Sequence, residues 1–361
     1  MFSSSDHTHM SQALQLAEKG LYSTSPNPRV GCVIVRDGSV VGSGWHERAG
    51  QAHAEIHALN VAGAVARGAT VYLTLEPCSH HGRTPPCAEA LIKAGVAKVV
   101  MAMQDPNPLV AGGGCALLQQ AGIEVQTGLL EAEARALNIG FITRMTHKRP
   151  WVRMKIAASL DGKTALNNGT SHWITAEPAR RDGHRWRARS CAVLTGIGTV
   201  LADDPQLTVR HVETTRQPLR VVVDSRLEIP VDARILCGGG ELIFTATASE
   251  GKIMALSDAG AHTIVLPDED GKVDLVRMMR TLADYEINEV LVEAGARLNG
   301  SLIKAGLVDE LVIYLVPCLI GDAAQSMLNL PELTDLAGKR ALKIQDLRMV
   351  GADIRIVARI G

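Results

Sequence analysis

The chain has 361 residues, of which 46% are hydrophobic and 21% charged, and its formal net charge is −1. This length exceeds that of one typical core and predicts about two domains, while the composition is that of an ordinary folded protein. The near-zero net charge argues against nucleic acid as the main partner and favours a small ligand.

Helical periodicity over residues 8–20 precedes two apolar runs that are joined by Asp37-Gly38, a turn pair typical of a β-hairpin. Helical and strand patterns then alternate, which predicts a layered α/β domain. The expected helices cover 52–63, 88–95 and 115–122, and the expected strands cover 69–77, 97–103 and 123–128.

A helical and then basic segment ends at Pro150, so we expect two domains, residues 1–148 and 149–361. A new sheet is expected to begin at 151–159. Apolar strands separated by helical or loop segments predict that the second domain is also α/β. These strands are expected at 191–198, 219–224, 241–246, 262–267, 289–295 and 310–317.

The N-terminus has no basic segment followed by an apolar run, and no apolar stretch of about 18 residues occurs in the chain. We therefore expect a cytoplasmic protein without a membrane association. The seven cysteines are scattered, so a disulfide framework is not expected. Five of them lie in apolar contexts and are expected in the core: Cys32, Cys115, Cys191, Cys237 and Cys318.

The first domain contains the pattern typical of a catalytic zinc site. His53 and Glu55 begin a predicted helix. Cys78 follows Pro77, and eight residues separate it from Cys87. One imidazole and two thiolates leave the fourth position of a zinc ion open for water, whose pKa falls toward about 7. Glu55 is the expected proton shuttle, and this H-x-E then P-C order is typical of nucleobase deaminases.

Two other interpretations of these residues remain open. His53 and His57 lie four apart on one helix face and would also suit a different zinc pair or a plain surface position. The two cysteines would suit a structural zinc site if His80 or His81 supplied a fourth ligand. The spacing of the cysteines also departs from the generic C-x-x-C, because the loop SHHGRTPP separates them.

The motifs NPRVGCVIV, HAEIHAL and EPCSHHGRTPPC resemble the deaminase half of the bifunctional riboflavin biosynthesis proteins. KIAASLDGKTA, SHWIT, VLTGIGTVLADDPQLTVR, VVVDS and VEAGARLNGSL resemble the reductase half of the same family, in the expected order. The resemblance implies a cytidine-deaminase-like three-layer α/β/α domain followed by a dihydrofolate-reductase-like α/β domain. It also implies deamination of a 2,5-diamino-6-ribosylamino-pyrimidinone 5′-phosphate, reduction of its ribosyl group to ribityl by NADPH, and a homodimer.

The resemblance assigns roles to individual residues of the first domain. His53, Cys78 and Cys87 match the zinc ligands of the family, and Glu55 matches its proton shuttle. Five loop residues look like its substrate contacts: Asn27, His46, Arg83, Thr84 and Asn107.

Residues 150–361 contain no G-x-G-x-x-G, but two strand–glycine–helix patterns point free backbone N–H groups toward an anion. One of them, Gly295 to Ser301, is the expected pyrophosphate cradle of NADPH, although a glycine after a strand is more often only a turn. The cradle comprises Gly295, Ala296, Arg297, Leu298, Asn299, Gly300 and Ser301. The resemblance adds Ala157, Trp173, Thr199, Asp203 and Ser225 as cofactor contacts.

The stretch ARRDGHRWRARS holds five arginines, and one helix face of it would suit a phosphate dianion, although such a run is usually a solvated face. The resemblance selects Arg187 as a substrate contact, and the others are expected at the surface. The resemblance gives further substrate contacts at Ser171, Leu207, Arg210 and Glu293. Hydride transfer to the sugar also needs a polar group that helps to open the ring, and Lys155 and Glu293 are the candidates. An inward-facing Lys155 needs a partner such as Glu293, and an outward-facing one would be a surface lysine.

Two rival functions remain at this point. One is a deaminase of free or RNA-borne nucleobases whose second half only binds ligand, which the 3% aromatic content and the neutral charge disfavour. The other is a non-enzymatic protein with a structural zinc and a nucleotide-sensing second half. Ammonia release and NADPH consumption discriminate between these two functions and a bifunctional deaminase and reductase.

Overall fold

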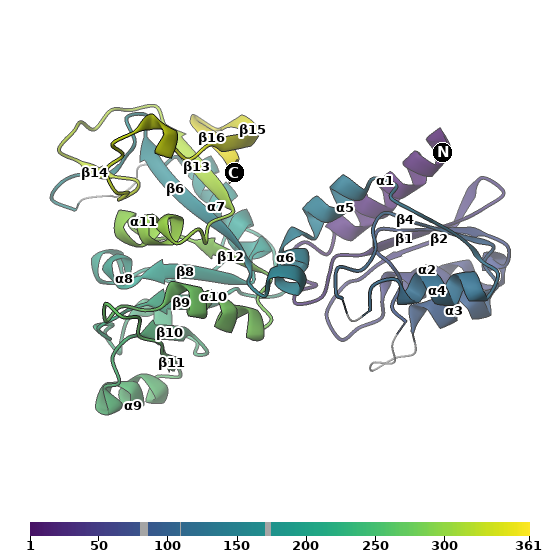
Figure 1. Cartoon of the computed structure of the whole chain (residues 1–361), viewed down its shortest axis with the longest axis horizontal. Coiled ribbons are helices and arrows are strands. Elements are labelled where there is room, and N and C mark those ends of the chain that lie inside the picture. Colours follow the sequence, from purple (N-terminus) through teal and green to yellow (C-terminus); the bar gives the residue numbers. More distant parts are fainter. Residues whose placement is uncertain (80–85, 109, 170–174) are drawn as a thin grey trace. The chain divides into compact units, whose positions relative to one another are not determined.

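The structure is a computed structural model that describes residues 1–79, 86–108, 110–169 and 175–361 (Figure 1). The chain forms two compact units, Met1–Lys148 and Arg149–Gly361. Among the described residues, no helix is both long and apolar enough to cross a membrane.

The first unit is built on one five-stranded sheet in the order β2-β1-β3-β4-β5. Strand β1 is antiparallel to both its neighbours, whereas β3, β4 and β5 are parallel. Asp37 and Gly38 have positive φ angles, as the tight turn between β1 and β2 requires. The strands are β1 (Gly31–Arg36), β2 (Ser39–Trp45), β3 (Thr70–Leu73), β4 (Lys98–Met101) and β5 (Glu124–Thr127).

Helices cover both faces of this sheet, as the three-layer expectation requires (Figure 1). One face packs against α1 (Ser4–Glu18), α5 (Glu131–Leu137) and α6 (Ile139–His147). The other packs against α2 (Ala54–Ala62), α3 (Cys87–Ala94) and α4 (Gly113–Gln120). Helix α1 begins earlier than residue 8, because Ser3 and Asp6 form a capping box at its N-terminus.

The second unit contains a nine-stranded sheet in the order β11-β10-β9-β8-β12-β6-β13-β16-β15. The first seven of these strands are parallel, and the last two form an antiparallel hairpin on the edge. The parallel strands are β6 (Trp151–Ser159), β8 (Ala192–Gly196), β9 (Leu219–Val223), β10 (Leu242–Thr245), β11 (His262–Val265), β12 (Glu289–Val292) and β13 (Glu310–Val316). The hairpin strands are β15 (Leu342–Val350) and β16 (Asp353–Ile360), and β7 (Lys163–Ala165) pairs separately with β14 (Gln325–Ser326).

Helices also cover both faces of this second sheet. Helices α10 (Leu275–Asp284) and α11 (Ala296–Lys304) pack on one face. Helices α7 (Glu177–Arg189), α8 (Ile197–Asp203) and α9 (Glu250–Asp258) pack on the other. The β15–β16 hairpin was not among the strands expected from the sequence.

The cysteine expectation holds in part. Cys32, Cys115 and Cys191 are buried, as predicted, but Cys237 and Cys318 are exposed. Both exceptions lie beyond the ends of regular elements, where the apolar run that suggested a core position has stopped. Cys237 follows a short 3₁₀ helix, Arg234–Leu236, and Cys318 follows β13.

Candidate active sites

Three metal-ligating side chains converge in the first unit. The Nδ1 of His53 lies 3.3 Å from the Sγ of Cys87 and 3.7 Å from the Sγ of Cys78. In a tetrahedral zinc site, bonds of about 2.0 and 2.3 Å place nitrogen and sulfur about 3.6 Å apart. The three donor atoms lie within 4.8 Å of one another. These residues therefore fit a zinc ion with one position left open.

The local backbone explains why these three residues meet. His53 is the N-cap of α2, and Cys87 is the first residue of α3, so both ligands lie at helix N-termini. The backbone N–H of Cys87 donates to the Sγ of Cys78 at 3.2 Å. Hydrogen bonding from the Cys87 thiol, with further help from His53, lowers the pKa of Cys78 to about 4.

Glu55 lies beside these ligands and not among them. Its side chain is only 3% exposed, and burial raises the pKa of its carboxyl. Glu55 and Cys87 are close enough for each to affect the pKa of the other. A buried carboxyl with a raised pKa, close to the metal ligands, is suited to take up and release a proton.

Of the expected substrate contacts of the first unit, Asn27 and His46 are linked to the zinc ligand His53. The Nδ2 of Asn27 donates to the Nε2 of His46 at 3.0 Å, and the His46 ring lies 5.3 Å from that of His53. His46 is almost fully buried, so it holds Asn27 and presents little surface of its own. Asn107 is half-buried. Arg83 and Thr84 lie outside the described residues.

In the second unit, the expected catalytic pair forms where β12 ends beside the middle of β6. Strands β6 and β12 are parallel with Met154 opposite Val292, which brings the next residues, Lys155 and Glu293, side by side. The Nζ of Lys155 lies 3.8 Å from a carboxylate oxygen of Glu293. The inward-facing interpretation of Lys155 is therefore the one observed.

Arg187 of α7 completes this cluster. Its Nε and Nη2 donate to the two oxygens of Glu293 at 2.5 and 3.0 Å, a bidentate pair. Burial opposes ionisation of Glu293, but the charge and hydrogen bonds of Arg187 outweigh it and lower the pKa of Glu293 to about 2. Burial also lowers the pKa of Lys155. The carboxylate of Glu293 is therefore held between Arg187 and Lys155. Lys155 releases its proton more readily than a surface lysine, because its pKa is lowered.

Both expected glycine turns are present at this edge of the sheet. Gly196 starts α8 directly after β8, and Gly295 starts α11 shortly after the neighbouring strand β12. The two turns are close, because a Cβ at Gly196 would lie 3.1 Å from the side chain of Leu298. No side chain caps the first turn of α11. Its N–H groups are therefore suited to an anion.

The later part of the expected cradle has a different environment. The amide of Asn299 is buried and donates to the carbonyl of Ala294 at 3.0 Å. Gly300 is buried against the backbone of Asn329, so no side chain fits there. Ser301 is exposed, and its hydroxyl donates to the carbonyl of Arg297.

The remaining expected contacts of the second unit differ in how they are presented. Leu207 has a φ of +51° and a buried side chain, so only its backbone is available to a ligand. Arg210 and Asp203 are exposed, and Thr199 and Ala157 are half-buried. The hydroxyl of Ser225 accepts from the backbone N–H of Val273 at 3.1 Å. Ser171 and Trp173 lie outside the described residues.

Comparisons with known proteins agree with this arrangement. The family profile described as "Cytidine and deoxycytidylate deaminase zinc-binding region" matches residues 3–103, and "RibD C-terminal domain" matches residues 150–356. The riboflavin biosynthesis protein RibD of Escherichia coli K12 is 49% identical, with 97% of this chain and 98% of that protein covered. The chain belongs to the RibD family of bifunctional riboflavin biosynthesis enzymes.

Solved structures of the RibD family extend this likeness to the whole fold. RibD of Acinetobacter baumannii superposes with a TM-score of 0.92 at 45% identity, and 99% of each chain is covered. A diaminohydroxyphosphoribosylaminopyrimidine deaminase/5-amino-6-(5-phosphoribosylamino)uracil reductase from Thermotoga maritima gives a TM-score of 0.88 at 33% identity, again with 99% of each chain covered. Like these RibD proteins, this chain contains a zinc-type deaminase domain and a reductase domain.

Three polar residues lie elsewhere than expected from the sequence or were not singled out by it. Arg189 was expected at the surface, but it donates to Glu289 at 3.0 Å because that buried carboxylate needs cationic partners. His184 was not considered, and its Nδ1 accepts from the backbone N–H of Arg210 at 3.2 Å. Glu76, next to Pro77, is buried and was also missed. The available signal for Glu76 was an acidic residue inside the apolar run that predicts a strand over 69–77.

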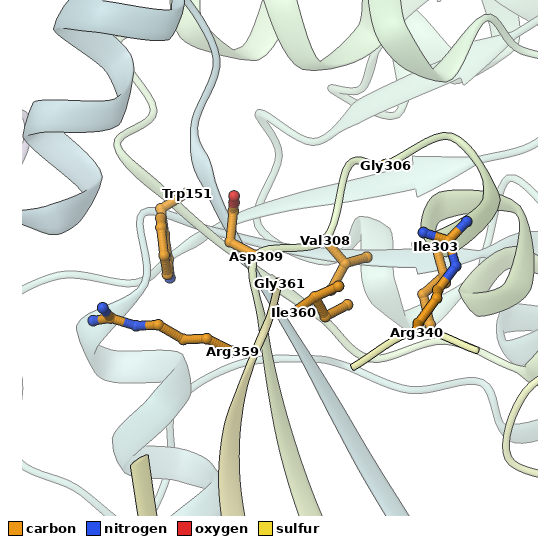
Figure 2. Close-up of a pocket in the computed structure, with 9 residues that line it drawn as sticks. All are labelled: Trp151, Ile303, Gly306, Val308, Asp309, Arg340, Arg359, Ile360 and Gly361. Atoms are coloured by element: carbon orange, nitrogen blue, oxygen red, sulfur yellow. The ribbon is translucent and has the colours of Figure 1, made fainter. Parts of the chain in front are cut away.

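A cavity of about 280 Å³ in the second unit has a lining that includes neither Lys155 nor Glu293. Figure 2 shows the residues that line it. Trp151, at the start of β6, lines it together with Arg359, whose guanidinium lies 5.4 Å from the indole centre. Glu293 and the two glycine turns instead follow the carboxyl ends of the strands. The cavity is therefore not part of the reductase cluster.

Proposed function

We propose that this chain deaminates 2,5-diamino-6-(5-phosphoribosylamino)pyrimidin-4-one and then reduces the ribosyl group of the product to ribityl with NADPH. Residues 1–148 would carry the zinc-dependent deamination and residues 149–361 the reduction. The observation that carries the first step is the cluster of one imidazole and two thiols with Glu55 beside it. Membership of the RibD family supports both steps.

In the deaminase, His53, Cys78 and Cys87 would hold the metal. When bound, zinc supplies Lewis acidity and makes a water nucleophilic near neutral pH. Glu55 would take a proton from the attacking water and deliver it to the leaving amino group, so that the C–N bond breaks and ammonia leaves. The carboxyl of Glu55 suits both halves of this transfer, because its burial raises its pKa.

In the reductase, the first turn of α11 and the start of α8 would hold the pyrophosphate of the cofactor. When bound, NADPH supplies the hydride that adds to C1 of the sugar. The ring oxygen then needs a proton, and Lys155, whose pKa is lowered, would give it. Glu293 would orient Lys155, and Arg187 keeps that carboxylate ionised through its bidentate pair.

Replacement of the proposed proton shuttle tests the deaminase. Glu55→Gln keeps the shape of the side chain but cannot accept and return a proton, so ammonia release should fall by about 10²–10⁴-fold. Zinc content should stay at the wild-type value. Glu133→Gln, on an exposed position of α5, is the matched control. A variant at Glu55 that releases ammonia at the wild-type rate would leave a structural zinc site as the better account.

The reductase is tested with the deaminated substrate supplied directly. NADPH absorbance should fall with the wild type, and Lys155→Met should slow that fall while ammonia release from the first substrate continues. Ammonia release without any NADPH consumption in the wild type would favour a nucleobase deaminase with a ligand-binding second domain.

The edge hairpin of the second sheet supports a homodimer. Four apolar side chains of β15, each about half exposed, share one face: Leu342, Ile344, Leu347 and Met349. A register shift between Ile344 and Asp346 keeps them on that face, because their partners are alternate residues of β16. An exposed apolar edge strand is a docking surface for another chain.

We expect sedimentation to give a dimer for the wild type. The double variant Ile344→Lys and Leu347→Glu should be a monomer, because it buries charges at the contact. A wild-type monomer at micromolar concentration would refute this assembly.

A further inference from the structure

Glu76 is a buried residue that follows β3 and lies two residues before the zinc ligand Cys78. It is 5% exposed, so it does not touch a ligand. One oxygen accepts from the backbone N–H groups of Asp105 and Gly112, at 3.1 and 3.0 Å. The other accepts from the N–H of Cys115 at 3.1 Å. A buried carboxylate is tolerated only when it is bonded in this way.

These three bonds attach the backbone at Asp105, Gly112 and Cys115 to the segment that follows β3. Gly112 is the N-cap of α4, and it offers no side chain to cap the helix. The Glu76 carboxylate replaces that cap, with its negative charge at the positive end of the helix. Close packing reinforces the attachment, since a Cβ at Gly114 would lie 2.1 Å from the carbonyl oxygen of Pro77.

The same bonds lead to Asn107. The side chain of Asp105, whose own N–H is held by Glu76, accepts from the N–H of Asn107 at 2.8 Å. The carbonyl of Asn107 accepts in turn from the N–H groups of Val110 and Ala111. The position of Asn107 relative to the loop that carries Cys78 is therefore set through Glu76.

We propose that Glu76 is a positioning residue of the deaminase, which fixes the Asn107 loop against the segment after β3 that carries the zinc ligand Cys78. This inference rests on the proposed deaminase function, with Asn107 as a substrate contact. Glu76 holds neither metal nor substrate. It sets the distance between the group that binds the pyrimidine and the centre that attacks it, and misplacement by about 1 Å is enough to slow a reaction a hundredfold.

Glu76→Gln tests the proposal with an isosteric side chain. The amide offers one acceptor oxygen, and its NH₂ group faces at least one of the three backbone N–H groups. We expect KM for the phosphorylated pyrimidine to rise about tenfold or more, while zinc content stays at the wild-type value. Hydrogen exchange at the amides of Asp105, Gly112 and Cys115 should become faster. Tyr72→Phe, which removes the 2.7 Å bond from Tyr72 to Asp6 in the same unit, is the control and should leave KM unchanged.

A double-mutant cycle separates positioning from a general loss of stability. If Glu76 acts through Asn107, adding Glu76→Gln to Asn107→Ala should cost little more than Asn107→Ala alone, because the two residues act as one unit. Effects that multiply would overturn the proposal, as would a wild-type KM in Glu76→Gln or a loss of zinc from it. If Glu76→Gln does not fold, Asp105→Ala, which breaks the next bond in the series, must raise KM in the same way.

A wild-type protein that releases no ammonia would instead refute the deaminase function itself. The two failures are therefore distinguishable.

Discussion

Replacing Glu293 by Gln should destabilise the second unit and remove part of its acid sensitivity. The carboxylate lies between Arg187 and Lys155, and all three side chains are largely buried. The amide keeps the shape but removes the charge that both cations share. Breaking a buried pair costs about 3–5 kcal/mol, because a desolvated charge is left without a partner.

The pKa of Glu293 gives a second value for the same cost. It falls from the ordinary 4.5 to about 2 in the folded protein. At about 1.4 kcal/mol per pH unit, this gap corresponds to about 3 kcal/mol at neutral pH. Since the folded pKa is the lower one, the stabilisation is complete above pH 4.5 and is lost as the pH falls toward 2. Glu293→Gln should lack this part of the pH dependence.

Urea unfolding followed by tryptophan fluorescence is a suitable assay. Three of the four tryptophans lie in the second unit, Trp151, Trp173 and Trp186, so the signal reports mainly on it. Glu228→Gln, in an exposed pair with Arg226, is the control and should change stability by less than about 0.5 kcal/mol. Equal stability of Glu293→Gln and the wild type at pH 7, or an unchanged acid response, would refute the reasoning.

Removal of the metal by a chelator should abolish ammonia release and spare NADPH consumption with the deaminated substrate; loss of both activities would contradict the assignment of zinc to the first unit. Gly300→Ala should destabilise the second unit by about 1–3 kcal/mol in urea unfolding, because the new Cβ would lie 1.9 Å from the carbonyl oxygen of Asn329. Gly198→Ala, a helical glycine with open space around it, should instead be neutral or slightly stabilising. A thiol reagent should label Cys237 and Cys318 of the zinc-loaded protein first, as mass spectrometry of peptides would show.

The zinc residues could be predicted from the sequence because their signals are local. His53 and Cys87 each begin a helix, and a helix start is visible in the pattern of a few neighbouring residues. The β15–β16 hairpin could not be predicted in the same way. The apolar side chains of β15 are two residues apart at Leu342 and Ile344 and again at Leu347 and Met349, but the bulge between these pairs inserts one extra residue. The period of two that marks a strand is therefore broken midway.

The residues that hold the sites in place depend on register and on distant partners, which a sequence pattern does not contain. Lys155 faces Glu293 because β6 and β12 are parallel with Met154 opposite Val292, and a shift of one residue would separate them. An acidic side chain suits position 76 because three backbone N–H groups, about 30 to 40 residues later in the chain, donate to it. A buried acidic residue without a local partner thus indicates that a distant backbone segment donates hydrogen bonds to it. In this chain, that segment carries Asn107, a proposed contact of the deaminase site.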